Sequence, residues 1–296
     1  MIAVDIGSNS LRAVKIDCDT LEPVFEREWI VRTAEELESR GVISDRAKER
    51  IKEALCQLRE LDEVKAVATE AFRRAKNAKE VIEEIKEACG VEIEVITPQL
   101  ESYYSLRGVE YGLKRSGYDI SKFVVADIGG GSTEIILKHK EEFVSKSFPI
   151  GILTTIERYK TKEEMVFGIK RELKEVKEYC LDLFELFGKP KVFVGTGGTP
   201  TTVAALKLGL TYESFDKKLV DGIEIGYEDI KRAYKKLFGL PKEERAKLVG
   251  TGREDAVMAG LVILEELMHV CGYGKMVVID EGVREGLALE FCSKKS

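Results

Sequence analysis

The sequence reads DIGSNSLR at residues 5–12 and DIGGGSTE at residues 127–134. The offset is 122 residues, and Asp, Ile, Gly and Ser occupy matching places in the two copies. An apolar run stands before and after each copy, which predicts a β-hairpin whose turn is rich in glycine and serine. A motif repeated at this distance indicates that the chain consists of two similar halves.

Strands and helices are expected to alternate through both halves, an order that predicts an α/β protein with a mixed sheet in each half. Beyond the two hairpins, strands are expected at residues 23–31, 64–68, 91–96, 142–148, 192–194 and 276–279. Helices are expected from Ser44, at 79–88, from Leu100, at 162–187, at 227–237, at 254–270 and from Val283. The polar stretch at 114–122 is the candidate hinge between the halves.

The composition is that of a folded protein. Of the 296 residues, 44% are hydrophobic and 34% are charged, and the net charge is −6. This excludes wholesale disorder, and the chain lacks the basic surface that non-specific nucleic-acid binding needs. Two Asn and two Gln occur in the whole chain. Enrichment in Lys and Glu with few amides is typical of heat-adapted proteins.

We expect a cytoplasmic protein that does not enter a membrane. The first residues, MIAVD, carry no basic leader, and no run approaches 18 apolar residues. Six cysteines lie far apart without a C-x-x-C pair, so neither a disulfide framework nor a zinc site is expected. They are expected to be small buried hydrophobic residues in a reducing compartment.

The two turns are candidate phosphate sites, because glycines let backbone N–H groups approach an anion and hydroxyls add further donors. A third loop, GTGGT at residues 195–199, precedes a helix and offers an anion site at its N-terminus. A single turn of this kind would be interpreted more simply as a tight hairpin. Two matched copies and a third glycine-rich loop favour phosphate binding. The residues expected to bind it are Gly7, Ser8, Asn9, Ser10, Gly129, Gly130, Gly131, Ser132, Thr133, Gly197, Gly198 and Thr199.

Asp5 and Asp127 stand where a strand ends and a phosphate turn begins. A carboxylate there would repel phosphate unless a divalent cation lies between them, so Mg²⁺ or Mn²⁺ is expected as cofactor. Each Asp could instead accept N–H bonds from its own turn. Glu134 interrupts an apolar strand and is either a further metal or water ligand or an exposed strand residue.

Arg73 and Arg74 follow an expected strand, and one of them near the turns would bind phosphate through two parallel hydrogen bonds. Arg73 is the candidate, and Arg74 is expected to face solvent. Glu101 opens a helix, where a glutamate is common because it complements the helix dipole. The residues by themselves favour that simple interpretation of Glu101.

The combined motifs resemble the exopolyphosphatase / guanosine pentaphosphate phosphohydrolase family (Ppx/GppA) in its short, two-domain form. The resemblance is carried by the two turns, by ATEAFR at 68–73 and by GTGGT at 195–199. FPIG at 148–151, GRED at 252–255 and GVREG at 282–286 extend it over nearly the whole chain.

This resemblance implies two duplicated RNase H-like domains of the actin–Hsp70–sugar kinase superfold, with mixed sheets and an interdomain cleft. The domains would span residues 1–118, joined by the C-terminal helix 283–296, and residues 119–282. The implied activity is Mg²⁺-dependent release of terminal orthophosphate from inorganic polyphosphate or guanosine pentaphosphate. Neither a nucleic acid nor a membrane is implied as partner, and a homodimer is left open.

The resemblance also gives Glu101 a catalytic role, as the general base that activates water. The family's S-G-x-E-E-A stretch corresponds to TPQLES at residues 97–102, and Glu101 matches the second glutamate. Leu100 replaces the first glutamate, and Thr-Pro replaces Ser-Gly.

Two other classes of function compete with a hydrolase. A kinase of the same superfold would share Asp5, Gly7 and the loop at 195–199, but the sequence contains no sugar-binding insertion. A non-catalytic nucleotide-binding protein is kept open by the altered stretch at 97–102.

Overall fold

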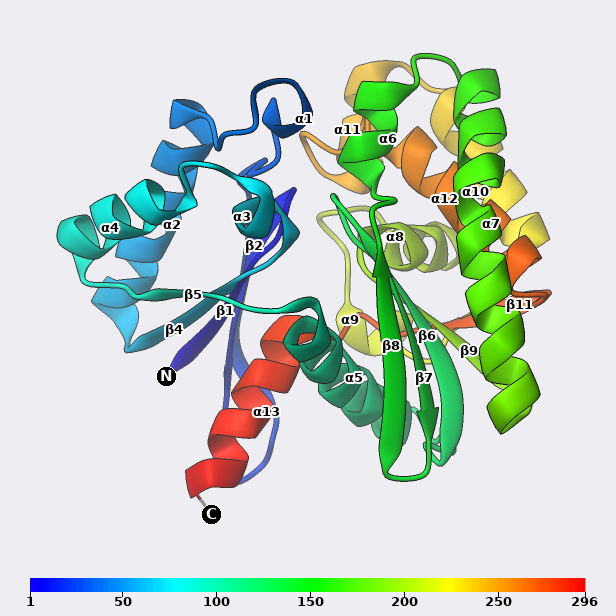
Figure 1. The fold of residues 1–296 in the computed structure, drawn as a ribbon, viewed down its shortest axis with the longest axis horizontal. Helices are drawn as coiled ribbons and strands as arrows, with labels where there is room; N and C mark the ends of the chain where they lie inside the picture. Colours follow the sequence, from blue (N-terminus) through cyan, green and yellow to red (C-terminus); the bar gives the residue numbers. More distant parts are fainter. Residues whose placement is uncertain (296) are drawn as a thin grey trace. The chain divides into compact units, whose positions relative to one another are not determined.

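A computed structural model describes residues 1–295 of the chain (Figure 1). The chain forms two compact units: Met1–Gly108 together with the chain from Glu281 onward, and Val109–Asp280. The division falls inside one long helix, α5 (Pro98–Arg115), whereas the sequence analysis placed the end of the first domain at residue 118.

The first unit is built on a five-stranded mixed sheet in the order β3-β2-β1-β4-β5. β1, β2 and β3 are antiparallel neighbours, and β4 and β5 continue the sheet parallel to β1. The strands are β1 (Ile2–Ile6), β2 (Ser10–Ile16), β3 (Pro23–Ile30), β4 (Val64–Ala68) and β5 (Ile93–Val95).

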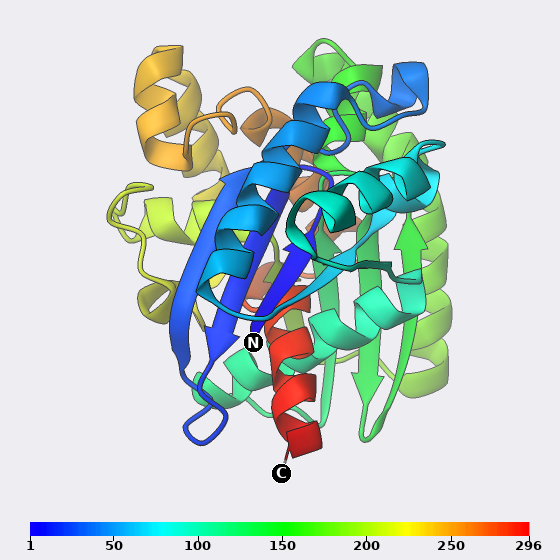
Figure 2. The ribbon, with the colours of Figure 1, turned by 90° about the vertical axis from the view of Figure 1, so that its left-hand side faces the viewer.

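Helices cover both faces of this sheet, with α2 and α4 side by side on one face and α13 packed on β1 and β2 (Figures 1 and 2). Ser44 caps α2 as expected, because its Oγ accepts a hydrogen bond from the Ala47 amide at 3.2 Å. Besides α5, the helices are α1 (Leu37–Arg40), α2 (Asp45–Leu61), α3 (Glu70–Arg74), α4 (Ala78–Cys89) and α13 (Val283–Lys295).

The second unit repeats the plan with six strands, in the order β10-β11-β9-β6-β7-β8. β6, β7 and β8 are antiparallel neighbours, as β1, β2 and β3 are, so the predicted duplication and the mixed sheets are confirmed. The strands are β6 (Lys122–Ile128), β7 (Thr133–His139), β8 (Glu142–Phe148), β9 (Val192–Thr196), β10 (Glu224–Gly226) and β11 (Lys275–Val278).

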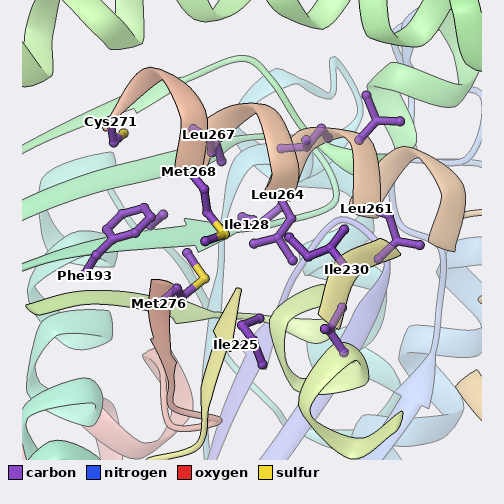
Figure 3. Packing of buried hydrophobic residues seen from close by; sticks show 14 of the residues in the cluster. Ile128, Phe193, Ile225, Ile230, Leu261, Leu264, Leu267, Met268, Cys271 and Met276 are labelled. Atoms are coloured by element: carbon purple, nitrogen blue, oxygen red, sulfur yellow. The ribbon is translucent and has the colours of Figure 1, made fainter. Parts of the chain in front are cut away.

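The helices α6, α7, α8 and α10 of the second unit pack on α12, a mainly apolar helix. Leu261, Leu264, Leu267 and Met268 of α12 lie over Ile128 of β6, and Phe193 and Met276 complete this layer (Figure 3). The helices are α6 (Ile152–Arg158), α7 (Lys162–Phe187), α8 (Gly198–Lys207), α9 (Lys217–Val220), α10 (Tyr227–Phe238), α11 (Lys242–Val249) and α12 (Val257–Val270).

The cysteines differ from the expectation. Cys18, after β2, and Cys292, on α13, form a disulfide across 274 residues of chain, so the prediction of unpaired thiols is wrong for this pair. The spacing in the sequence could not reveal it, because the fold returns the C-terminal helix to the first unit. Cys180 and Cys271 are buried thiols, as expected, with their sulfur atoms 3.4 Å apart.

No helix within residues 1–295 is both long and apolar enough to cross a membrane.

Candidate active site

The first turn joins β1 to β2 and is closed by a hydrogen bond from the Gly7 amide to the Ser10 carbonyl at 2.9 Å. The carbonyls of Ser8 and Asn9 accept hydrogen bonds from the loop that follows β3, at 2.9 and 2.8 Å. A trans peptide directs its N–H away from its C=O. The amides that follow these two carbonyls, those of Asn9 and Ser10, therefore point away from that loop, as an anion site requires.

The second turn, between β6 and β7, is closed in the same way, by the Gly129 amide and the Ser132 carbonyl at 2.9 Å. The carbonyls of Gly129 and Gly130 accept hydrogen bonds from the first amides of α6, at 3.1 and 2.7 Å. The amides of Gly130 and Gly131 consequently point away from α6. The structure thus builds two turns in which neighbouring backbone fixes the carbonyls and orients the amides.

Gly151 lets α6 approach the second turn this closely. A Cβ atom at this position would overlap the Gly130 carbonyl and the backbone of Gly131. FPIG at residues 148–151 therefore has a physical explanation, because only glycine allows the chain to pass here.

The two hydroxyls after the glycines serve other contacts. Ser132 donates to Glu134 at 2.8 Å, and Thr133 donates to the Ile150 carbonyl at 2.6 Å. Thr133 is fully buried. Its side chain thus lies beneath the turn and supports it, and its hydroxyl is not directed to a ligand of the turn.

The third loop lies beside the second turn. Gly197 has a φ of 95°, and a Cβ atom there would lie 2.6 Å from the Ile128 carbonyl, directly before the turn. Gly198 begins α8, so the N-terminal amides of that helix lie in the same region. Thr199 is buried against Gly260 of α12, which leaves its backbone, and not its hydroxyl, for an anion.

The carboxylates differ between the two units. Asp127 of β6 and Glu134 of β7 are directly opposite each other, whereas Asp5 of β1 is opposite Arg12 of β2. Like charges directly opposite in a sheet are destabilising, whereas opposite charges stabilise it. Only the second unit therefore carries two adjacent carboxylates at its turn. Glu134 is 2% exposed, which excludes the solvent-facing alternative for this residue.

Arg73 and Glu101 are brought together in the first unit. The Arg73 guanidinium lies 2.7 Å from Glu101 Oε2, donates to the Ile96 carbonyl at 2.9 Å and pairs with Glu70 at 3.2 Å. Glu101 is 8% exposed. A helix-end glutamate needs no such burial or partner, so the simple interpretation of Glu101 does not account for its surroundings.

Arg74 points elsewhere. It pairs with Glu38 of α1 and lies 3.8 Å from Glu70, and about a third of its side chain is exposed. The sequence predicted that Arg74 faces solvent, and it gave no signal for these two acidic partners.

Ser147 of β8, whose hydroxyl donates to Glu134 at 2.6 Å, was not predicted as a site residue. No motif marks a serine in an exposed, alternating strand, so the sequence offered no signal for it. Among residues 1–295, no group of three or more His, Cys, Asp or Glu side chains is arranged to hold a metal.

Two domains, each opening with strand–turn–strand, define this molecule as an α/β protein of the actin-like fold. Residues 12–295 match the model of the Ppx/GppA phosphatase family, and the chain belongs to this family.

Relatives and solved structures agree with this assignment. Exopolyphosphatase 2 of Mycobacterium tuberculosis is 29% identical, over 97% of this chain and 97% of its own length. The guanosine-5'-triphosphate,3'-diphosphate pyrophosphatase of Vibrio vulnificus is 26% identical over 99% of this chain and 59% of its own. The crystal structure of the Aquifex aeolicus Ppx/GppA family member superposes with a TM-score of 0.75 and 31% identity, covering 100% of this chain and 98% of that one.

The family resemblance, the fold class and the expectation of a phosphate-releasing enzyme are thus confirmed. The roles of the individual site residues remain predictions.

Proposed function

We propose that this chain hydrolyses the terminal phosphoanhydride bond of inorganic polyphosphate, of guanosine pentaphosphate, or of both. The observation that carries the proposal is the pair of matched turns, each with its carbonyls fixed by neighbouring backbone and its amides left to bind an anion. The names of two relatives, an exopolyphosphatase and a guanosine-5'-triphosphate,3'-diphosphate pyrophosphatase, support phosphate chains of these two kinds.

In the first unit, amides of the first turn are proposed to bind phosphate oxygens; in the second unit, amides of the second turn and of the third loop are proposed to do so. Two buried atoms beside the first turn, Asn9 Oδ1 and Thr33 Oγ1, have no hydrogen-bond partner within residues 1–295. Buried polar atoms normally have partners, so a polar group bound here would satisfy them. This favours the first turn as a ligand site.

Glu101 is the proposed general base. It would take a proton from the water that attacks the terminal phosphorus, and the leaving group would be the shortened phosphate chain. Arg73 fixes the carboxylate through the contact at 2.7 Å, and its guanidinium is proposed to bind phosphate as well. Arg73 is therefore proposed to act in both binding and positioning.

The residues present fit a divalent cation of the Mg²⁺ or Mn²⁺ type. Mg²⁺ is usually held by one or two carboxylates, with water and phosphate oxygens completing the shell. Asp127 and Glu134 of the second unit are adjacent carboxylates of this kind, and in the first unit Asp5 is proposed as a cation ligand. Such an ion would neutralise charge on the transferred phosphoryl group.

We also infer that the protein works in the cytoplasm of a heat-adapted organism. The composition rich in Lys and Glu supports this. The disulfide is compatible with it, because intracellular proteins of hyperthermophiles are an exception to the rarity of cytosolic disulfides.

The test compares orthophosphate release from short polyphosphate, long polyphosphate and guanosine pentaphosphate, with Mg²⁺ and with excess chelator. Release from at least one substrate, abolished by chelator, is the expected result. Undiminished orthophosphate release in excess chelator would contradict the requirement for a divalent cation. Binding of all three substrates without release of orthophosphate would indicate a non-catalytic binding protein. Incubation with ATP and a panel of sugars covers the kinase alternative, which predicts phosphosugar and no free phosphate.

A further inference from the structure

Three residues form a row across the first three strands of each unit. In the second unit the row is Asp127 of β6, Glu134 of β7 and Ser147 of β8, each directly opposite the next. Residues directly opposite in antiparallel strands lie on the same face of the sheet, so their side chains are neighbours.

The first unit has the equivalent row, formed by Asp5 of β1, Arg12 of β2 and Glu28 of β3. Here the charges alternate, and Arg12 donates to Glu28 at 3.0 Å. The third strand thus supplies a side chain that holds the charged residue of the middle strand.

Ser147 occupies the place of Glu28 in the duplicated row. The middle residue of the second row is a carboxylate, and the third strand supplies a hydroxyl donor to it at 2.6 Å. Ser132 donates to the same oxygen, Glu134 Oε1, at 2.8 Å. These two hydrogen bonds, from Ser132 and from Ser147, restrict the rotation of the buried Glu134 carboxylate.

We propose that Ser147 is a positioning residue, which orients Glu134 beside Asp127 for binding a divalent cation. The proposal rests on the proposed function, because it assigns Glu134 to cation binding. Groups that hydrogen-bond a metal ligand set its orientation, and their loss typically costs 10- to 100-fold in metal affinity or activity. In this proposal Ser147 contacts neither substrate nor cation and acts through Glu134.

The first experiment measures Mn²⁺ binding by electron paramagnetic resonance in the whole chain, without substrate. Ser147→Ala should weaken Mn²⁺ binding about 10- to 100-fold, whereas Ser147→Thr, which keeps a hydroxyl, should restore most of it. Ser145→Ala is the matched control, because Ser145 lies two residues away on the same face of β8, opposite Ile136. It should bind Mn²⁺ as the wild type does. Equal Mn²⁺ affinity for Ser147→Ala and wild type would overturn the proposal, as would a wild type that binds no Mn²⁺.

A double-mutant cycle separates positioning through Glu134 from a general structural role. If Ser147 acts only through Glu134, Ser147→Ala should have little further effect on Mn²⁺ affinity or kcat in a Glu134→Gln chain. Equal losses in both backgrounds, or a lower melting temperature with unchanged Mn²⁺ affinity, would contradict the proposal. A wild type that binds Mn²⁺ but releases no phosphate would contradict the proposed function alone, and the cycle in Mn²⁺ affinity would still decide the role of Ser147.

Discussion

Arg73 and Glu101 form the most informative pair of side chains in the first unit. Arg73 is held from three sides, by Glu101, Glu70 and the Ile96 carbonyl, so its guanidinium has a fixed direction. Because the guanidinium is already held in place, its side chain would lose little conformational entropy on binding phosphate. The same contact holds Glu101, so the proposed phosphate binding by Arg73 and the proposed water activation by Glu101 would be coupled.

Arg73→Ala should therefore reduce both substrate affinity and turnover. A lost charged hydrogen bond costs about 1.5–3 kcal/mol. Arg74→Ala is the control, because Arg74 pairs with Glu38 and about a third of each side chain is exposed; pairs near the surface contribute about 0–1 kcal/mol. Steady-state kinetics of the two variants should separate them. Unchanged kinetics in Arg73→Ala together with reduced substrate affinity in Arg74→Ala would mean that Arg74 is the phosphate ligand.

Glu101→Gln keeps the size of the side chain and removes its basicity. If Glu101 takes the proton of the attacking water, turnover should fall by about 10²–10⁴-fold with little change in substrate affinity. Rate and melting temperature should be measured on one preparation. A normal rate with a lower melting temperature would make Glu101 a structural residue, and Glu70 and Glu134 would be the next candidates for the base.

At this scale the sequence predicted residue types better than residue contacts. The turn glycines, Arg73 and Glu101 were named from motifs, and Glu101 only through the family resemblance. The contact between Arg73 and Glu101 joins positions 28 residues apart, and no local pattern records it. Ser147 was missed for the same reason, because strand pairing alone places it against Glu134.

At the scale of elements, the second turn depends on the chain that follows β8. The first amides of α6 bind the carbonyls of Gly129 and Gly130, and Thr133 binds the Ile150 carbonyl. The orientation of the turn amides is therefore set by a segment outside the repeated motif. The long elements were predicted well because their hydrophobic periodicity is strong, for example in α7. The short helices α1, α3, α6, α9 and α11 were not predicted, because a segment of eight or fewer residues is too short to show a clear hydrophobic period.

Gly151→Ala tests this support of the turn. The added Cβ atom would overlap the Gly130 carbonyl, so the turn or α6 must move. Turnover should then fall at least tenfold, because a misplacement of about 1 Å typically costs about 10²-fold in rate. Gly274→Ala is the matched control in the same unit, since no atom lies within 4 Å of its added Cβ. The check compares kcat/KM and melting temperature for both variants. Wild-type kinetics for Gly151→Ala would show that the turn does not need this close approach.

At the scale of the whole molecule, the disulfide joins positions 18 and 292, so that most of the chain lies in one closed loop. A cross-link lowers the entropy of the unfolded chain, and removing a native disulfide typically costs about 2–5 kcal/mol. The two-unit division and the duplicated sheets followed from the repeat and the order of elements. This covalent link did not, because cysteine spacing carries no information about pairs that only tertiary structure joins.

Cys292→Ser should lower the free energy of unfolding by about 2–5 kcal/mol. Cys18→Ser should lower it equally, and the double variant should lose no more than either single variant, because all three remove one bond. Denaturant unfolding under non-reducing conditions measures this. Additive losses, or no loss on reduction of the wild type, would contradict a stabilising disulfide between these residues.

The central claim is that water attacks the terminal phosphorus of a phosphate chain, with Glu101 as base. Hydrolysis in ¹⁸O-labelled water, with mass spectrometry of the products, tests it most directly. We predict one ¹⁸O atom in each released orthophosphate, none in the shortened chain, and a labelled release that is about 10²–10⁴-fold slower in Glu101→Gln. Label in the shortened chain, unlabelled orthophosphate, or an unchanged rate in Glu101→Gln would contradict the account.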